Sequence, residues 1–250
     1  MNMRSMMHMH MPLVAESANP QGTLLQVEGL TFFYPQRPLF NGWSARIGPG
    51  VTLVLGGDGA GKTTLLRLLA GDLAAQAGSL QIQGVLLAAQ PQAYRQHIFW
   101  ADPQTQVFDA ITPLQYFHQV RQIYPGFLPP DAPQLAVLLA GLSLTEHLHK
   151  PLYRLSTGSK RKVWLAAAFA AEATVTLLDD PFAGLDKPSI RFVQQQLTRM
   201  AKESERACVV AHYESLGDVP LAQVIDLDAR SVLATAQFVT VRGIAPFCDA

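Results

Sequence analysis

Residues 51–64 decide the fold, and they read Val51-Thr52-Leu53-Val54-Leu55-Gly56-Gly57-Asp58-Gly59-Ala60-Gly61-Lys62-Thr63-Thr64. The stretch begins with an apolar, β-branched run that is typical of a buried strand. It continues with the pattern G-x-x-x-x-G-K-[ST], in which glycines without side chains let backbone N–H groups surround a phosphate. Leucines at helical spacing follow over residues 64–70, and such a helix directs the positive end of its dipole at the loop. Strand, loop and helix thus predict a nucleotide site.

The loop supplies most of the candidate binding residues. Lys62 is expected to reach the outer phosphates, and the hydroxyl of Thr63 is expected to bind Mg²⁺. The candidate nucleotide-binding residues here are Gly57, Asp58, Gly59, Ala60, Gly61, Lys62, Thr63 and Thr64.

The remaining pattern predicts an α/β protein. Residues 23–34 alternate apolar and polar side chains, and residues 175–178 and 207–211 are buried-strand candidates separated by a helical stretch over 189–204. Strands that alternate with helices favour a mostly parallel sheet covered on both faces. Prolines between 104 and 155 punctuate two helical stretches, 114–123 and 134–142. We therefore expect a helical subdomain inserted into the α/β core.

Composition narrows the class of protein. Lys plus Arg and Asp plus Glu number 19 each in 250 residues, and only 15% of residues are charged, so a strong positive field for nucleic acid is not expected. The longest apolar run, residues 163–171, is far shorter than the ~20 residues needed to cross a bilayer. Two cysteines, Cys208 and Cys248, fit a reducing compartment. These features predict a cytoplasmic protein.

A pair of acids is placed to complete the nucleotide site. Asp179 and Asp180 follow the strand candidate over 175–178. A carboxylate at the end of a buried strand beside a phosphate loop is suited to the Mg²⁺ shell, and a second one is suited to orient an attacking water.

Several motifs together resemble those of ATP-binding cassette (ABC) proteins. Leu155-Ser156-Thr157-Gly158-Ser159 resembles the family's signature motif, and residues 179–186 resemble its Walker B segment running into the D-loop. His212, after an apolar strand, resembles the switch histidine, and Tyr34 matches the aromatic residue that stacks on adenine. The resemblance covers residues 24 to 230.

The resemblance implies a fold and a mechanism. The fold is a P-loop NTPase core with an N-terminal antiparallel β region, and the cofactors are ATP and Mg²⁺, with Thr63 and Asp179 at the metal. Two cassettes pair head to tail, as a homodimer or heterodimer, so that Ser156 and Gly158 of one face the phosphate loop of the other. Asp180 and His212 are the candidate catalytic residues, and Asp186 belongs to the composite binding site.

The sequence departs from the family pattern at two positions near the reaction. Asp180 stands where most members have glutamate, and a carboxylate one methylene shorter predicts slower hydrolysis, because small misplacements cost about 10²-fold in rate. The glutamine of the family's Q-loop falls on Ala101, which has no polar group. Asp102 or Gln104 could replace it after a small loop shift.

The leading functional hypothesis is the ATPase subunit of a membrane transporter, acting through separate transmembrane permease subunits at the inner face of the cell membrane. An exporter is favoured over an importer. The alternatives are a soluble, non-transport ABC ATPase and a weakly hydrolysing regulatory cassette. The sequence does not identify the transported substrate.

We predict three parts of the chain. Residues 1–22 are a Met/His-rich flexible tail, whose side chains could bind Cu(I) but are explained more simply as an unstructured extension. Residues 23–235 form the cassette, with the helical subdomain inserted at about 104–160, and residues 236–250 are a C-terminal extension.

Overall fold

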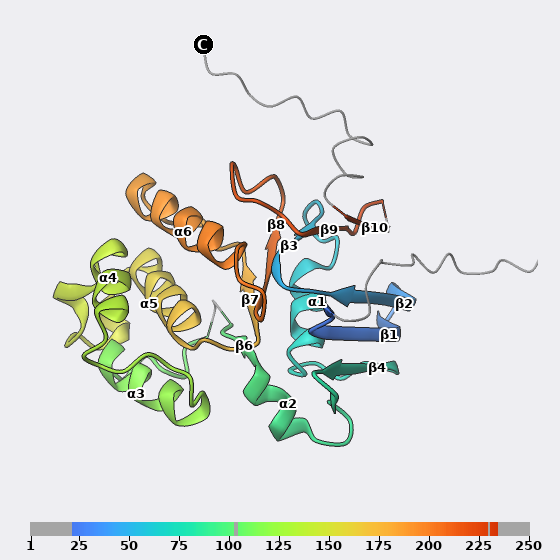
Figure 1. Cartoon of the computed structure of the whole chain (residues 1–250), viewed down its shortest axis with the longest axis horizontal. Helices are drawn as coiled ribbons and strands as arrows, with labels where there is room; N and C mark the ends of the chain where they lie inside the picture. Colours follow the sequence, from blue (N-terminus) through green and yellow to red (C-terminus); the bar gives the residue numbers. More distant parts are fainter. Residues whose placement is uncertain (1–21, 103–104, 230, 235–250) are drawn as a thin grey trace, which may run out of the picture.

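The computed structural model describes residues 22–102, 105–229 and 231–234. The strands are β1 (Leu25–Tyr34), β2 (Arg37–Ile47), β3 (Gly50–Leu55), β4 (Ala77–Ile82), β5 (Val85–Leu86), β6 (Ile98–Trp100), β7 (Val175–Asp179), β8 (Ala207–His212), β9 (Gln223–Asp226) and β10 (Ser231–Ala234). The helices are α1 (Lys62–Leu69), α2 (Pro91–His97), α3 (Pro113–Ile123), α4 (Pro133–Gly141), α5 (Thr157–Ala170) and α6 (Lys187–Met200), with short 3-10 turns η2 (Thr145–His147) and η3 (Leu152–Arg154). Figure 1 shows their arrangement.

The larger sheet places the functional segments side by side. Its strand order is β10-β9-β3-β8-β7-β6, and only the β9–β10 pair is antiparallel. Leu55 pairs with His212, and Asp179 pairs with Ala211. The carboxyl ends of β3, β7 and β8 therefore meet at one edge, which is where ligands bind in open α/β sheets.

The smaller sheet, in the order β2-β1-β4-β5, is antiparallel and covers α1. The leucines of α1 are fully buried, because they pack on β1 and β4 on one side and on the larger sheet on the other. Figure 1 shows α1 between the two sheets. This packing anchors the helix that begins at Lys62, directly after the phosphate loop.

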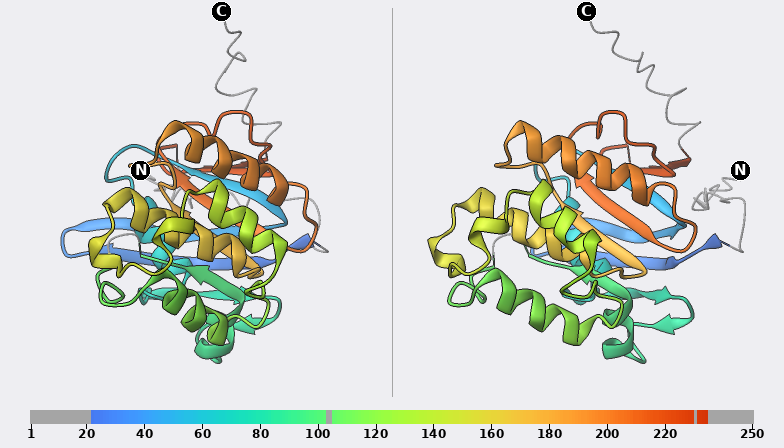
Figure 2. Two further views of the ribbon diagram at one scale, coloured as in Figure 1. Left: turned by 90° about the vertical axis from the view of Figure 1, so that its left-hand side faces the viewer. Right: turned by 60° about the vertical axis from the view of Figure 1, so that its left-hand side comes forward.

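Helices α3, α4 and α5 form a separate group on the side of the molecule opposite the antiparallel sheet (Figures 1 and 2). Their core is aromatic, with ring centroids of Trp164 and Tyr116 4.6 Å apart and those of Phe108 and Tyr116 4.9 Å apart. α5 joins this group to the large sheet because all of its residues after Arg161 are buried.

The fold predicted from the sequence is confirmed. The strand candidates at 23–34, 51–55, 175–178 and 207–211 correspond to β1, β3, β7 and β8, and the helical stretches at 114–123 and 134–142 correspond to α3 and α4. The sequence reasoning did not find β2, β4, β5, β6, β9, β10 or α2. No helix in the described part of the chain is long and apolar enough to cross a bilayer. Residues 1–21 and 235–250 lie outside the described residues, so the predicted tail and extension stay predictions.

Candidate functional site

A cleft of about 420 Å³ lies at the carboxyl ends of β3, β7 and β8. It brings together most of the residues that the sequence singled out. Its lining consists of Tyr34, Arg37, Leu39, Asp58, Gly59, Gly61, Lys62, Thr63, Thr64, Arg161, Asp179, Asp180, His212 and Tyr213.

The phosphate loop is held in a curved conformation. Gly59 (φ 74°) and Gly61 (φ 102°) lie in the left-handed region, which glycine adopts without steric cost. The ammonium of Lys62 donates hydrogen bonds to the carbonyl oxygens of Gly56 (2.7 Å) and Gly57 (2.9 Å). Arg37, from the start of β2, donates to the carbonyl of Gly59 at 2.6 Å. Basic groups therefore lie where phosphates are expected.

Thr63 and Asp179 converge at the base of the cleft. The hydroxyl of Thr63 donates to Asp179 Oδ2 at 2.6 Å, although the two residues come from different elements. Burial raises the pKa of Asp179, and the Thr63 hydroxyl opposes that rise. A hydroxyl and a carboxylate oxygen at this separation are the hard donors that Mg²⁺ prefers, so the residues present fit this ion.

Asp180 and His212 face each other at the next position along the edge. His212 Nε2 lies 3.6 Å from Asp180 Oδ1, and the histidine side chain is only 4% exposed whereas that of Asp180 is 42% exposed. The main chain of Glu214 contacts the other ring nitrogen of His212, at 3.0 Å from its carbonyl oxygen. Phe182 packs edge-on against the same ring, with centroids 5.4 Å apart. The histidine is thus fixed in orientation beside an accessible carboxylate.

Tyr34 lies at the entrance of the cleft. The residue is 40% exposed, and its hydroxyl is 3.3 Å from Thr64 Oγ1. An exposed aromatic face beside a phosphate loop is suited to stack on a base, so adenine stacking stays a prediction that this position allows.

Ser156 and Gly158 do not line this cleft, and neither do Gly57, Ala60 and Asp186. Ser156 is the N-cap of α5, and its Oγ accepts a hydrogen bond from the N–H of Ser159 at 3.1 Å. Gly158 approaches the D-loop so closely that an added Cβ would lie 2.4 Å from the carbonyl oxygen of Gly184.

Asp186 has structural partners in this chain. It caps α6 by accepting from the N–H of Ser189 at 2.9 Å, and it pairs with the ammonium of Lys162 at 2.5 Å. The Lys162 ammonium, followed by the Ser189 N–H, holds the pKa of Asp186 well below its usual range.

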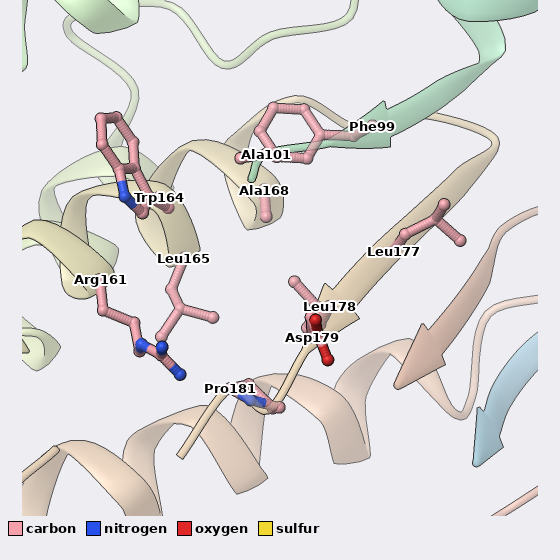
Figure 3. Close-up of a pocket in the computed structure, with 10 residues that line it drawn as sticks. All are labelled: Phe99, Ala101, Arg161, Trp164, Leu165, Ala168, Leu177, Leu178, Asp179 and Pro181. Atoms are coloured by element: carbon pink, nitrogen blue, oxygen red, sulfur yellow. The ribbon is translucent and has the colours of Figure 1, made fainter. Parts of the chain in front are cut away.

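Ala101 lines a second, smaller cavity of about 30 Å³, which Asp179 also lines. Figure 3 shows Ala101, Trp164 and Arg161 around it, with the Arg161 guanidinium directed toward Asp179 and Pro181. Gln104, which could have replaced the missing Q-loop glutamine, lies outside the described residues. Ala101 itself offers no polar group at this position.

Sequence reasoning missed Arg37, Leu39, Arg161 and Tyr213 as cleft residues. Arg161 stands in the basic run Lys160-Arg161-Lys162, where nothing distinguishes it from a solvated helix start. Arg37 follows Tyr34 by three positions, and only the β1–β2 hairpin shows that it turns back over the loop.

The phosphate loop follows β3, the two acids lie at the end of β7, and the histidine lies at the end of β8, the strand between β3 and β7. This arrangement defines a P-loop nucleoside triphosphatase. Residues 40–183 match the family model described as "ABC transporter". The chain belongs to this family, and it is the ATP-binding, ATP-hydrolysing subunit of an ABC transporter. ABC ATP-binding subunits pair with transmembrane permease components.

Curated relatives agree with this assignment. The cytochrome c biogenesis ATP-binding export protein CcmA of Cupriavidus necator is 33% identical over 215 residues, which cover 83% of this chain and 89% of the relative. The protein of the same name from Escherichia coli O157:H7 is 32% identical over 188 residues, covering 75% and 86%.

Solved structures confirm the fold. The ATP-binding subunit of an ABC transporter superimposes with a TM-score of 0.76 at 20% identity, over 88% of this chain and 94% of that chain. The cbiO1 protein of Clostridium perfringens, described as part of the ABC transporter complex cbiONQ, superimposes with a TM-score of 0.65 at 25% identity, over 89% and 92%.

Proposed function

We propose that the chain works as one half of a head-to-tail pair that binds two ATP molecules with Mg²⁺ and, by closing and opening, drives a separate transmembrane subunit. ATP-dependent closing of this kind is a ligand-gated shift between two populations. The pair is a homodimer or a heterodimer with a related cassette, attached peripherally to the membrane through the permease.

The observation that carries this proposal is that the cleft lacks the residues of the signature motif. The loop, the acids and His212 line it, whereas Ser156 and Gly158 at the start of α5 do not. A helix N-terminus offers backbone donors and a positive dipole to an anion. A second copy, turned head to tail, would bring this helix start to the outer phosphate and enclose the nucleotide.

Each cleft residue has a proposed role. Lys62 would hold the outer phosphates, and Thr63 with Asp179 would hold Mg²⁺, which would neutralise charge on the phosphates. Asp180 orients the attacking water by accepting a hydrogen bond from it, and then takes its proton. His212 fixes the Asp180 carboxylate and contacts the outer phosphate. Because Asp180 has the shorter side chain, its carboxylate reaches less far than a glutamate would, and we expect slow turnover.

The test is an Asp180→Asn variant of the full chain, with size measured by light scattering in ATP and Mg²⁺. Asparagine keeps the shape of the side chain but cannot take the proton, so ATP hydrolysis should stop and an ATP-bound dimer should accumulate. The matched control is Lys62→Ala, which should stay monomeric because the cation that binds phosphates is gone. Wild-type turnover in Asp180→Asn, or a monomer at saturating ATP, would remove Asp180 from this role.

We further propose where the membrane subunit docks. Val107 (82% exposed), Leu114 (40%) and Tyr153 (58%) are large apolar side chains on adjoining segments, and we name them the docking surface. The N–H of Tyr153 donates to the carbonyl of Asp109 at 2.9 Å, which holds the two segments together. Exposed apolar side chains on a rigid support are typical of protein interfaces.

The direction of transport is proposed to be export. The support is the name of the curated relatives from Cupriavidus necator and Escherichia coli O157:H7, which are described as export proteins.

A further inference from the structure

We propose that Arg161 is a positioning residue for ATP hydrolysis, which acts from α5 on the main chain of Asp180 and keeps its carboxylate facing His212. This inference rests on the proposed role of Asp180 in orienting water. It gives the helical subdomain a direct connection to the reacting end of the cleft.

Arg161 bridges two parts of the fold. It belongs to α5, yet its Nη1 donates a hydrogen bond to the carbonyl oxygen of Asp180, just beyond β7. It also lines both cavities, the large nucleotide cleft and the small one that Asp179 also lines. In Figure 3 the guanidinium projects from α5 toward the end of β7.

Asp180 needs contacts that fix its main chain, because its backbone conformation is energetically unfavourable. Its φ is 45°, in the left-handed region where residues with a Cβ are strained. Such a conformation persists only when the surroundings fix it. The N–H of Asp180 donates to the carbonyl of Ala211 at 2.9 Å, and its own carbonyl accepts from Ala183 (3.2 Å) and Arg161. Arg161 is the charged member of this set, and charged donors make the stronger hydrogen bonds.

Arg161 also lies beside the neighbouring acid. Arg161 and Asp179 line the same small cavity, and in Figure 3 the guanidinium is directed toward Asp179. Among the described residues that line the small cavity, Arg161 is the only cation, and Ala101 contributes only a methyl group. The positive charge next to Asp179 in this cavity therefore comes from this guanidinium.

Arg161 is not required to fasten α5 to the loop that follows β7. Gly158 already contacts Gly184, and Lys162 pairs with Asp186 at 2.5 Å. These two contacts lie on either side of Arg161 along α5. Removing the guanidinium should therefore leave the packing in place and release only the conformation of Asp180.

The experiment compares kcat, KM for ATP and the thermal midpoint in the full chain. Arg161→Met keeps the aliphatic stem and removes the donors. We expect kcat to fall about 10- to 100-fold, because a small displacement of the water-orienting group is costly, while KM stays within about twofold of wild type. Arg161→Lys should recover at least part of the rate, because its ammonium retains a donor for the Asp180 carbonyl.

Arg95→Met is the matched control. Arg95 also extends from a helix and donates to a main-chain carbonyl, that of Gly71 at 2.7 Å, but it does not line the cleft. Its kcat should equal that of wild type. If Arg161→Met does not fold, Arg161→Gln, which remains polar at this half-buried position, replaces it in the comparison with Arg161→Lys.

Two results would overturn the inference: a kcat within about twofold of wild type in the variant without the guanidinium, or a lysine variant no faster than that variant. Asp180→Asn measured alongside separates the two proposals. If Asp180→Asn abolishes turnover but Arg161→Met turns over at the wild-type rate, only the proposed role of Arg161 fails. If Asp180→Asn itself turns over normally, the proposed role of Asp180 fails.

Discussion

The negative charge of Asp179 makes the folded state less stable than a neutral side chain at this position would. Burial disfavours the ionised form and raises its pKa above the ordinary value of 3.8. Where the pH is above this raised pKa, the group is ionised in both the folded and the unfolded chain, so its desolvation lowers the stability of the folded state. The proposed Mg²⁺ site explains why a carboxylate is nevertheless present.

Asp179→Asn should therefore stabilise the chain at pH 7 while abolishing ATP hydrolysis. Asparagine retains an acceptor for the Thr63 hydroxyl and carries no charge. We expect the thermal midpoint to rise by a few degrees, measured without nucleotide.

The pH dependence of this gain has a defined sign. Because the folded-state pKa is raised, the cost of the charge is complete above that pKa and disappears as pH falls through it toward 3.8. The advantage of Asp179→Asn over wild type should shrink in the same window. An advantage that is constant from pH 7 to pH 4 would contradict this account.

The contact between α5 and the D-loop depends on the absence of a side chain at Gly158. A Cβ there would meet the carbonyl oxygen of Gly184, a backbone atom in a segment that is itself in the left-handed region at φ 71°. Gly158→Ala should destabilise the chain by about 1–3 kcal/mol and lower ATP hydrolysis, as measured by thermal unfolding and phosphate release.

Gly126→Ala is the control for this change. A Cβ at Gly126 would make only ordinary contacts, the nearest at 3.6 Å, and its φ does not require glycine. An equal loss of stability in both variants would show that the close contact of Gly158 with Gly184 is not the cause of the loss in Gly158→Ala.

The elements that the sequence predicted are those with the least ambiguous patterns. Strands β3, β7 and β8 are buried on both faces and read as continuous apolar runs. β6 has only three residues, and β2 is an edge strand with six exposed positions, so neither gave a pattern that sequence reasoning recognised. The phosphate loop and acid pair were predictable because each motif is local. The contacts of Arg37 and Arg161 were not, because they depend on tertiary proximity.

At the scale of the whole molecule, we predict that the docking surface is required for binding to a membrane subunit. Val107→Glu with Tyr153→Glu places two charges on the exposed apolar side chains, which should prevent docking on a membrane subunit without affecting the cleft. We expect the fraction of chain recovered with membranes to fall at least about tenfold, since charges buried without partners at an interface cost several kcal/mol.

Val137→Glu is the control, because Val137 is an equally apolar, 53% exposed residue on α4, outside the docking surface. ATP binding should be unchanged in both the double variant and the control. Membrane recovery of the double variant at the wild-type level would show that the permease contacts another face.

The lysine of the phosphate loop is hydrogen-bonded within the loop itself. Lys62 donates to the carbonyl oxygens of Gly56 and Gly57, and these two hydrogen bonds brace the curve of the loop. Nucleotide binding is then an exchange of partners, in which Lys62 gives up two acceptors in return for phosphate oxygens. A polyphosphate offers more charged acceptor oxygens for this exchange than a single phosphate group does. We therefore expect the loop to favour a nucleoside triphosphate over inorganic phosphate or a nucleoside monophosphate before the proposed second cassette takes part.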